Sequence, residues 1–429
     1  MSRLFSARYK IVLFRKLWIA LAKGQRQLGL PISEKQIVQM VAEVENIDFD
    51  ATEKYEKKFR HDVMAHIHAF GDVCPEAKGI IHLGATSSYV TDNADLIQLK
   101  EGMALLFGKL LYVLERLAEL AAKYANDPCL SYTHFQPAQP TTIGKRICLW
   151  LQDFLLDAKE WSRLEIPFLG AKGATGTQAS FLALFDGDHK KVLELEKKTA
   201  AEFGFISILP IAGQTYTRKI DIQIANALES FAASAHKMAT DIRLLAHEGE
   251  FCENFGETQV GSSAMPYKRN PIYSERICGI ARFAISLAQN PTYTAATQWL
   301  ERSLDDSSNR RLCIPELFLS VDAILNLLAH ILSSPHIEPA IAFSHFERHL
   351  PELCMENLIM EGVKKGGDRQ KLHEKYRTMS ADDPELKTAD PRKLIGRAPE
   401  QVADFLKMDV HPFLRKHPVG KVSIPPVER

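Results

Sequence analysis

The sequence predicts an all-α protein organised around a bundle of long helices. In three stretches the apolar residues recur at alternating steps of four and three residues, which lines them up along one face of a helix. Runs of about 25 residues correspond to roughly 35 to 40 Å of helix, a length typical of near-antiparallel bundles. Seams this long also predict packing against a second subunit. The runs are Leu106 to Tyr124, Ile224 to Leu245 and Ile314 to Ile331, and a fourth begins at Ile143.

Length and composition limit the class of protein. A chain of 429 residues is too long for one ordinary core, so we expect two or three domains. The 53 basic and 53 acidic residues balance, which argues against nucleic acid or an acidic membrane surface as a partner. The most apolar run, Leu317 to Leu332, contains Asp322 and His330, so we expect a core helix and a soluble protein. The seven cysteines show no paired short spacing, which favours a reducing, cytoplasmic compartment.

The N-terminal segment is basic, which leaves two interpretations. No acidic residue precedes Glu34, a feature of mitochondrial targeting segments. Against targeting, serine is sparse, and the helix expected from Phe14 to Leu28 ends at Gly29 as a folded element does. Ser33 and Gln36 then have the spacing of a capping box. We therefore expect this segment to belong to the fold.

A second helix is expected from about Thr52 to Phe70, and it contains three histidines. His61 and His66 lie five residues apart, about 140° around a helix, which is unsuitable for binding one metal ion together. No metal site is therefore predicted, and structural histidines are the usual interpretation. Further along, Thr86 and Ser87 precede an apolar run. Hydroxyls there are typical of a helix N-cap, and a helix N-terminus also binds carboxylate or phosphate.

The irregular stretches between the seams carry the remaining polar groups. His134 lies in a proline-bounded turn before a helix expected from Thr141, and Gln214 precedes the second seam. The glycine-rich stretch 170–178 lacks both common phosphate-loop patterns. Residues 301–311 hold three arginines and three serines around an acidic pair. That composition suits either a solvated approach to a helix or a phosphate clamp.

Residues 261–275, GSSAMPYKRNPIYSE, have no apolar period and contain a glycine and two prolines, so they predict a loop. Ser262, Lys268 and Asn270 bring a hydroxyl, a cation and an amide together. These groups are suited to holding an anion. A solvated basic loop is the plain alternative.

The same stretch resembles the signature loop of the fumarase/aspartase superfamily, G-S-S-x-M-P-x-K-x-N followed by a glutamate, and Tyr267 with Arg269 is similar to its adenylosuccinate lyase branch. The resemblance implies a three-domain, fumarase/aspartase-like all-α fold with a central long-helix bundle, completed by a homotetramer with shared active sites. The implied ranges are 1–86 for an N-terminal helical domain, 87–337 for the bundle and 338–429 for a small C-terminal domain. The last range is shorter than in the family between Tyr376 and Gly396.

The resemblance also implies a reaction in purine nucleotide biosynthesis. Fumarate would be eliminated from adenylosuccinate to give AMP, and from the succinyl-carboxamide imidazole ribotide (SAICAR) to give AICAR, without a cofactor. By residue-to-residue match, Ser262 would be the base and His134 the general acid, with His61 as a second candidate. Glu275 would orient His134 or Lys268.

The remaining matches concern substrate binding. Lys268 and Asn270 would hold the succinyl carboxylates, together with Thr86 and Ser87. The other matched positions are Arg8, Tyr9, Arg302, Ser307 and Arg311 for phosphate and ribose, Gln214 and Arg276 near the succinyl and base ends, and Arg60 and Asp62.

Two alternatives stay open. Argininosuccinate lyase belongs to the same superfamily, but its substrate has no phosphate, and Arg8, Tyr9 and the arginines of 302–311 argue against it. A non-catalytic structural member of the superfamily would keep the fold without the chemistry. Intact Ser262, Lys268 and His134 argue against that reading.

Overall fold

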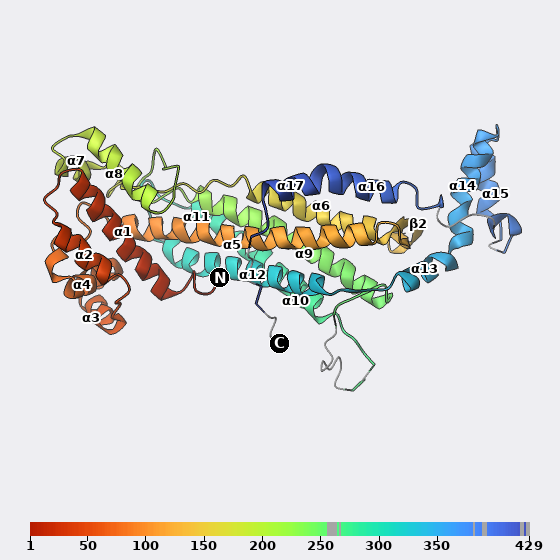
Figure 1. The fold of residues 1–429 in the computed structure, drawn as a ribbon, viewed down its shortest axis with the longest axis horizontal. Helices are drawn as coiled ribbons and strands as arrows, with labels where there is room; N and C mark the ends of the chain where they lie inside the picture. Colours follow the sequence, from red (N-terminus) through yellow and green to blue (C-terminus); the bar gives the residue numbers. More distant parts are fainter. Residues whose placement is uncertain (255–263, 266, 381, 388–392, 421–423, 426–429) are drawn as a thin grey trace. The chain divides into compact units, whose positions relative to one another are not determined.

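The structure is a computed structural model of the chain (Figure 1), and it describes all residues except 255–263, 266, 381, 388–392, 421–423 and 426–429. The chain divides into two compact units. Unit 1 comprises Met1–Leu105, Arg163–Leu228 and Ser286–Leu319, and unit 2 comprises Leu106–Ser162, Glu229–Ile285 and Ser320–Arg429. The three ranges 1–86, 87–337 and 338–429 stay a prediction.

Helices make up most of the described chain, which confirms the all-α fold class. Unit 1 contains α1 (Ala7–Gln27), α2 (Glu34–Ala42), α3 (Phe49–Phe59), α4 (Asp62–Val73), α7 (Ala179–Leu184), α8 (His189–Glu202) and α11 (Asn290–Ala296). Both units contain parts of α5 (Ser87–Lys123), α9 (Lys219–His247), α10 (Ile272–Leu287) and α12 (Asp306–Ser333). Unit 2 contains α6 (Ile143–Trp161), α13 (Pro339–Arg348), α14 (Leu350–Lys364), α15 (Arg369–Arg377), α16 (Ala398–Phe405) and α17 (His411–Lys416).

Capping side chains set where the first two helices begin. Ser6 caps α1 by accepting a hydrogen bond from the Tyr9 amide, so this helix begins earlier than the predicted Phe14. The Ser33 and Gln36 capping box is present at the start of α2, as predicted. Trp18 and Leu17 are fully buried on α1. The basic N-terminal segment is therefore a core helix of unit 1.

The predicted helix from Thr52 to Phe70 is wrong, because the chain breaks into α3 and α4. Arg60 adopts a left-handed conformation with φ of 52° and ends α3. His61 is the N-cap of α4, where its side chain accepts a hydrogen bond from the Met64 amide. The apolar spacing continues across the break, so periodicity alone could not locate it. Arg60 to Asp62 consequently form a corner between two helices.

Unit 2 is a helical bundle in which the predicted seams are buried. Leu106, Leu110, Val113 and Leu117 on α5 are fully buried, as are the central residues of the α9 seam. The ring of Phe231 on α9 packs against Phe154 and Trp161 of α6. The helix α12 is long and apolar enough to cross a membrane by length and composition, but 61% of its most apolar window is buried. That degree of burial is typical of a core helix.

A β-hairpin joins α5 to α6, which the sequence did not predict. Strands β1 (Pro128–Thr133) and β2 (Gln136–Thr142) pair antiparallel, with Thr133 opposite Gln136. Prolines are tolerated in β2 because a two-stranded sheet has only edge strands. Thr142 then caps α6, close to the predicted helix start at Thr141. Two further short strands, β3 (Phe251–Cys252) and β4 (His336–Ile337), also pair in unit 2.

The C-terminal part of unit 2 consists of shorter helices, as expected. Near α14 and α15, Ile359, Tyr376 and Leu386 form a small buried cluster. The Tyr376 hydroxyl donates to Glu385 over 2.7 Å.

Candidate active site

The predicted catalytic base, Ser262, lies outside the described residues, so the candidate site is built from the other positions. They divide between the units. Unit 1 contains Arg8, Tyr9, Arg60, His61, Asp62, Thr86, Ser87, Gln214, Arg302, Ser307 and Arg311. Unit 2 contains His134, Lys268, Asn270, Glu275 and Arg276.

In unit 1 the corner at Arg60 to Asp62 meets α12. Asp62 Oδ2 lies 3.3 Å from Arg311 Nη2, and both side chains are largely exposed. His61 Nδ1 accepts from the Met64 amide at 3.3 Å, so the neutral ring carries its proton on Nε2. His61 is thus oriented by its own helix and keeps a donor atom on the other edge of the ring. These contacts bring together two stretches that lie far apart in the sequence.

The N-terminus of α5 meets a second arginine. Ser87 is the first residue of this helix, and the Thr86 carbonyl accepts from the Tyr89 amide at 2.9 Å. Arg302 Nη1 donates to Ser88 Oγ over 2.9 Å. A guanidinium beside hydroxyls and helix N–H groups is a favourable site for an anion. Ser88 was not among the predicted substrate-binding residues, although its hydroxyl adjoins that of Ser87.

Gln214 is held by two backbone segments. Its amide N–H donates to the Glu301 carbonyl at 3.1 Å, and its side-chain Nε2 donates to the Ala174 carbonyl at 3.1 Å. A Cβ on Gly176 would lie 1.8 Å from the Ala212 carbonyl oxygen, so this close approach requires glycine. The glycine-rich stretch therefore supports Gln214, a role that its sequence did not reveal. With Nε2 engaged, Gln214 would contact a ligand through Oε1.

Arg8 and Tyr9, at the start of α1, bind acidic side chains. Arg8 Nη2 donates to the Glu45 carbonyl at 2.8 Å and lies 3.3 Å from its carboxylate. The Tyr9 hydroxyl donates to Glu101 over 2.6 Å. Burial and this carboxylate raise the pKa of Tyr9, so it stays a neutral donor. Ser307 lies in the first turn of α12, where its amide donates to the Leu304 carbonyl at 3.1 Å.

In unit 2, His134 and Phe135 form the turn of the hairpin, and both have positive φ, 53° and 56°. A two-residue turn with both residues in this region normally uses asparagine or glycine. Larger side chains there are strained, and such strain is concentrated at functional sites. Both side chains are exposed. The hairpin also borders a cavity of about 520 Å³.

The described part of the 261–275 stretch leads into α10. The Lys268 amide donates to the Met265 carbonyl at 3.1 Å, and the Lys268 side chain is exposed. Glu275 lies in the first turn of α10, and Arg276 follows it. Buried Glu253 accepts from the amides of Tyr273 and Ser274 at 3.0 and 2.6 Å. This contact joins the segment at Glu253, which precedes the stretch, to the beginning of α10.

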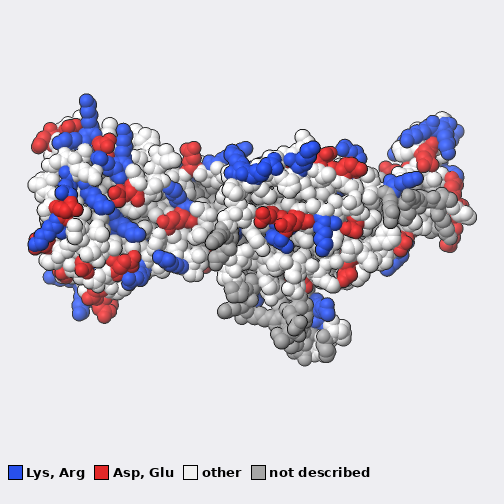
Figure 2. All heavy atoms as spheres, viewed as in Figure 1, with Lys and Arg blue, Asp and Glu red and all other residues white. Residues whose placement is uncertain are grey.

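Within the part of the chain that the structure describes, no group of three or more His, Cys, Asp or Glu side chains is placed to hold a metal ion. Figure 2 shows Lys and Arg interspersed with Asp and Glu over α1 to α4 and α8 on the visible face. The candidate anion site of unit 1 is therefore built from the local arginine contacts, since this face shows both signs of charge mixed.

Comparison with known proteins identifies relatives of the whole chain. Residues 6–285 match a family model described as lyase. The chain is 46% identical to the adenylosuccinate lyase of Schizosaccharomyces pombe, over 96% of this chain and 92% of that protein. It is 44% identical to the enzyme of Saccharomyces cerevisiae, over 97% and 93%, and 32% identical to that of Pyrococcus abyssi, over 89% and 84%.

Solved structures resemble the fold. The 3-carboxy-cis,cis-muconate lactonizing enzyme of Pseudomonas putida has a TM-score of 0.83 at 21% identity, covering 96% of this chain and 97% of that one. A fumarate lyase of Mesorhizobium sp. BNC1 has a TM-score of 0.80 at 23% identity, covering 95% and 97%. These likenesses concern the fold alone. Because relatives of much higher identity span almost its whole length, the chain belongs to the adenylosuccinate lyase family.

Proposed function

We propose that the protein eliminates fumarate from adenylosuccinate to give AMP, and from SAICAR to give AICAR. The geometric observation that carries this proposal is the arginine arrangement of unit 1. Arg302 binds Ser88 at the N-terminus of α5, and Arg311 binds Asp62. These contacts join three stretches whose residues match the substrate-binding positions of the family.

The chemistry requires a base, an acid and fixed positive charge. A proton leaves the carbon next to a carboxylate, which gives a doubly charged aci-carboxylate, and the nitrogen is protonated as it departs. Ser262 would take the proton, and nearby cations would lower the pKa of its hydroxyl. Lys268 and Asn270 would hold the succinyl carboxylates.

His134 would protonate the departing nitrogen. Its position at a strained hairpin turn supports this role, because the turn leaves the imidazole exposed. His61 is the second candidate, since its ring is oriented through Nδ1 and offers Nε2–H. Glu275, on the first turn of α10, would orient His134 or Lys268.

The phosphate would bind in unit 1. Arg302 and Ser307 supply donors near the N-termini of α5 and α12. Arg8 and Tyr9 are bound to Glu45 and Glu101, so they would exchange these carboxylates for the nucleotide. Arg60, Asp62, Arg276 and Gln214 would complete the contacts to the remainder of the substrate.

We also propose a cytoplasmic homotetramer with shared active sites, acting on small molecules rather than on nucleic acid or membranes. Several large apolar side chains of unit 1 are exposed, including Trp299 at 74% and Leu300 at 99%. Leu304 and Leu312, at 70% and 71%, flank the start of α12. An exposed group of this kind is typical of a surface that another subunit covers.

The test follows the purine absorbance band after purified protein is mixed with adenylosuccinate. We expect conversion to AMP and fumarate, and a loss on the order of 10² to 10⁴ in kcat for Ser262→Ala. Argininosuccinate serves as the control substrate. Turnover of argininosuccinate alone would contradict the phosphate assignment. A folded tetramer that acts on neither substrate would favour a structural, non-catalytic protein.

A further inference from the structure

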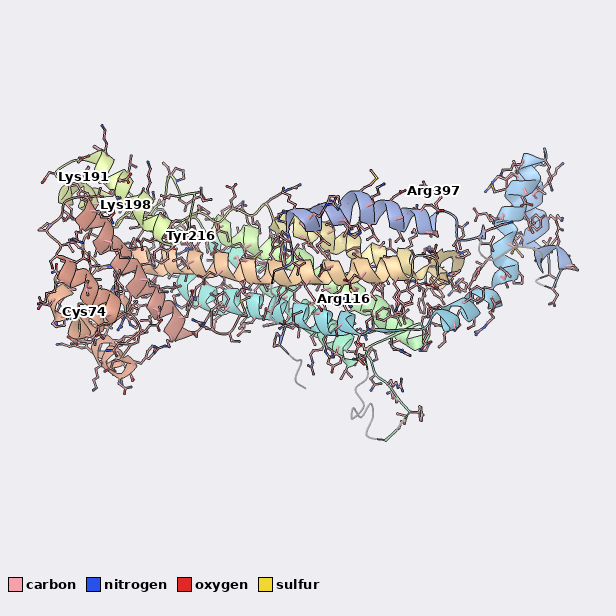
Figure 3. All side chains as sticks on the ribbon, in the orientation of Figure 1. Cys74, Arg116, Lys191, Lys198, Tyr216 and Arg397 are labelled. Atoms are coloured by element: carbon pink, nitrogen blue, oxygen red, sulfur yellow. The ribbon has the colours of Figure 1, made fainter. Side chains whose placement is uncertain are left out.

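A network of mostly buried charged groups and one tyrosine in unit 1 has no role in the chemistry above. It joins four chain segments: α1, α5, the stretch leading into α9, and the beginning of α12. Tyr216, labelled in Figure 3, lies within it and is 1% exposed. The members are Lys10, Asp92, Asp95, Tyr216, Arg218, Asp221, Asp306 and Arg310.

Arg218 joins α5 to α12. Its Nη1 donates to Asp92 Oδ2 at 2.9 Å, and its Nη2 lies 2.6 Å from Asp306 Oδ2. All three side chains are at most 3% exposed. The same Asp92 oxygen accepts from the Tyr216 amide at 3.1 Å. The stretch before α9 is therefore fixed to both helices.

Arg310 forms the second half of the network. Its Nε donates to Asp221 Oδ2 at 2.7 Å and its Nη1 to Asp95 Oδ2 at 3.0 Å. The Tyr216 hydroxyl accepts from Arg310 Nη2 and donates to Asp221 Oδ1. Lys10 of α1 reaches Asp95 Oδ1 at 3.0 Å. Burial alone would raise the pKa of Asp95, but Lys10 and Arg310 lower it to about 2, so it stays ionised.

Each joined segment also carries candidate substrate-binding residues next to a network member. Tyr9 precedes Lys10, and Gln214 lies two residues before Tyr216. Ser88 and Asp92 are four residues apart on α5, hence on one face of the helix. On α12, Ser307 follows Asp306, and Arg311 follows Arg310. Along the chain, the network members therefore adjoin the proposed phosphate and ribose contacts on every joined segment.

Stability alone does not account for such a network. Buried ion pairs contribute little more than apolar residues of the same size, because desolvation offsets their attraction. Asp306 Oδ1 is buried and has no hydrogen-bond partner within the described chain. A connected set of charged hydrogen bonds does, however, hold its members in one geometry.

We propose that this network is a positioning device that holds α1, α5, the Gln214 stretch and the start of α12 in register for the nucleotide phosphate. The inference rests on the proposed function for the identity of the ligand. Tyr216, Arg218 and Arg310 are its central positioning residues. Loosening the network should weaken contacts to phosphate more than contacts to the remainder of the ligand.

The test compares binding of AMP and adenosine by calorimetry in the full-length protein. Tyr216→Phe removes the hydroxyl that bridges Arg310 and Asp221 and keeps the buried ring. We expect the preference for AMP over adenosine to fall about tenfold, with adenosine affinity little changed. In turnover, KM for adenylosuccinate should rise while kcat changes less than about threefold.

The control is Tyr376→Phe, which removes a buried hydroxyl that also donates to a carboxylate, but in unit 2. It should leave the AMP preference unchanged. Lys10→Met removes the ammonium group at the partly exposed edge of the network. It should lower the preference for AMP over adenosine less than Tyr216→Phe does. This second variant keeps the test valid if Tyr216→Phe does not fold.

Equal loss of AMP and adenosine binding, or an unchanged AMP preference in both network variants, would overturn the inference. So would a wild-type protein without a preference for AMP. A protein that prefers AMP in the expected way but does not cleave adenylosuccinate would support the network and contradict the proposed function.

Discussion

Unit 1 joins buried charges from four segments into one network, whereas the buried charges that the structure describes in unit 2 lie in small separate sets. Arg218 and Arg310 connect α5, α9 and α12 in unit 1, and Lys10 adds α1 through Asp95. In unit 2, Lys109 binds Asp322 and Asn326. Arg146 and His345 bind Glu250 in a second set, and Asp157 accepts from Ser230 in a third. The surrounding seams of unit 2 are apolar.

The difference indicates what each unit contributes. The proposed phosphate contacts of unit 1 come from several segments, and these segments must keep their relative positions to bind one ligand. The proposed acid of unit 2, His134, belongs to one hairpin whose strands set its position. A network is needed where binding groups converge from separate segments, while a single turn is positioned by its own hydrogen bonds.

Among the substitutions that test this contrast between the two units, His134→Asn should have the largest effect on activity. Asparagine tolerates the left-handed conformation, so His134→Asn should keep the hairpin while removing the proton donor. We expect kcat for adenylosuccinate to fall on the order of 10² to 10⁴, with little change in thermal stability. The measurements are steady-state kinetics and thermal unfolding.

Phe135→Asn is the matched control, because it alters the neighbouring position of the same turn. Its effect on kcat should be far smaller. Equal losses in both variants would mean that the shape of the hairpin, and not the imidazole, is what catalysis requires.

An intermediate effect is expected at Asp157, the buried carboxylate of α6. Burial raises its pKa to about 6, above the ordinary value of 3.8. The folded state therefore holds a proton that the unfolded chain releases, and stability falls as pH rises from about 4 through 6. Asp157→Asn should remove this fall and stabilise the protein at pH 7 by about 1 to 3 kcal/mol.

Chemical denaturation at about pH 4.5 and about pH 7 would measure this effect, because these values lie below and above the pKa of Asp157 in the folded state. Glu160→Gln, on the exposed side of the same helix, should change the free energy of unfolding by less than about 0.5 kcal/mol. A destabilised Asp157→Asn variant at pH 7 would show that the carboxylate is favourable in the bundle.

The smallest effect is expected at His66 in unit 1, with the opposite dependence on pH. Burial lowers its pKa to about 4, so the folded state keeps the ring neutral. Stability is then present above pH 6.5 and is lost as pH falls toward about 4, because the unfolded chain takes up the proton. His66→Phe keeps the edge contact with Phe14. It should reduce the free energy of unfolding that is lost at acid pH by about 1 to 2 kcal/mol.

Unfolding free energies at several pH values would check the prediction. If His66→Phe loses as much folding stability at acid pH as the wild type does, the loss comes from other groups. His82 is one of these, since its pKa is also lowered to about 4.

Local features were predictable from the sequence. The heptad seams of α5 and α9 are buried as expected, and the capping box of Ser33 and Gln36 is present. Both depend on residues within a few positions of one another. The turn at His134 was expected, but the break at Arg60 and the β-hairpin around that turn were missed, because each uses a left-handed conformation in a residue that seldom adopts it.

By itself, the sequence determined the helical class of this protein, its family through the 261–275 stretch, and the residue types available for an elimination. Only the tertiary structure decided which of them meet. Arg310 and Asp95 pair although they lie 215 positions apart in the sequence, and Arg302 and Ser88 pair across 214 positions. The physical reason is that such a pair forms only when packed helices bring two distant segments within hydrogen-bond distance, and spacing along the chain carries no record of that approach.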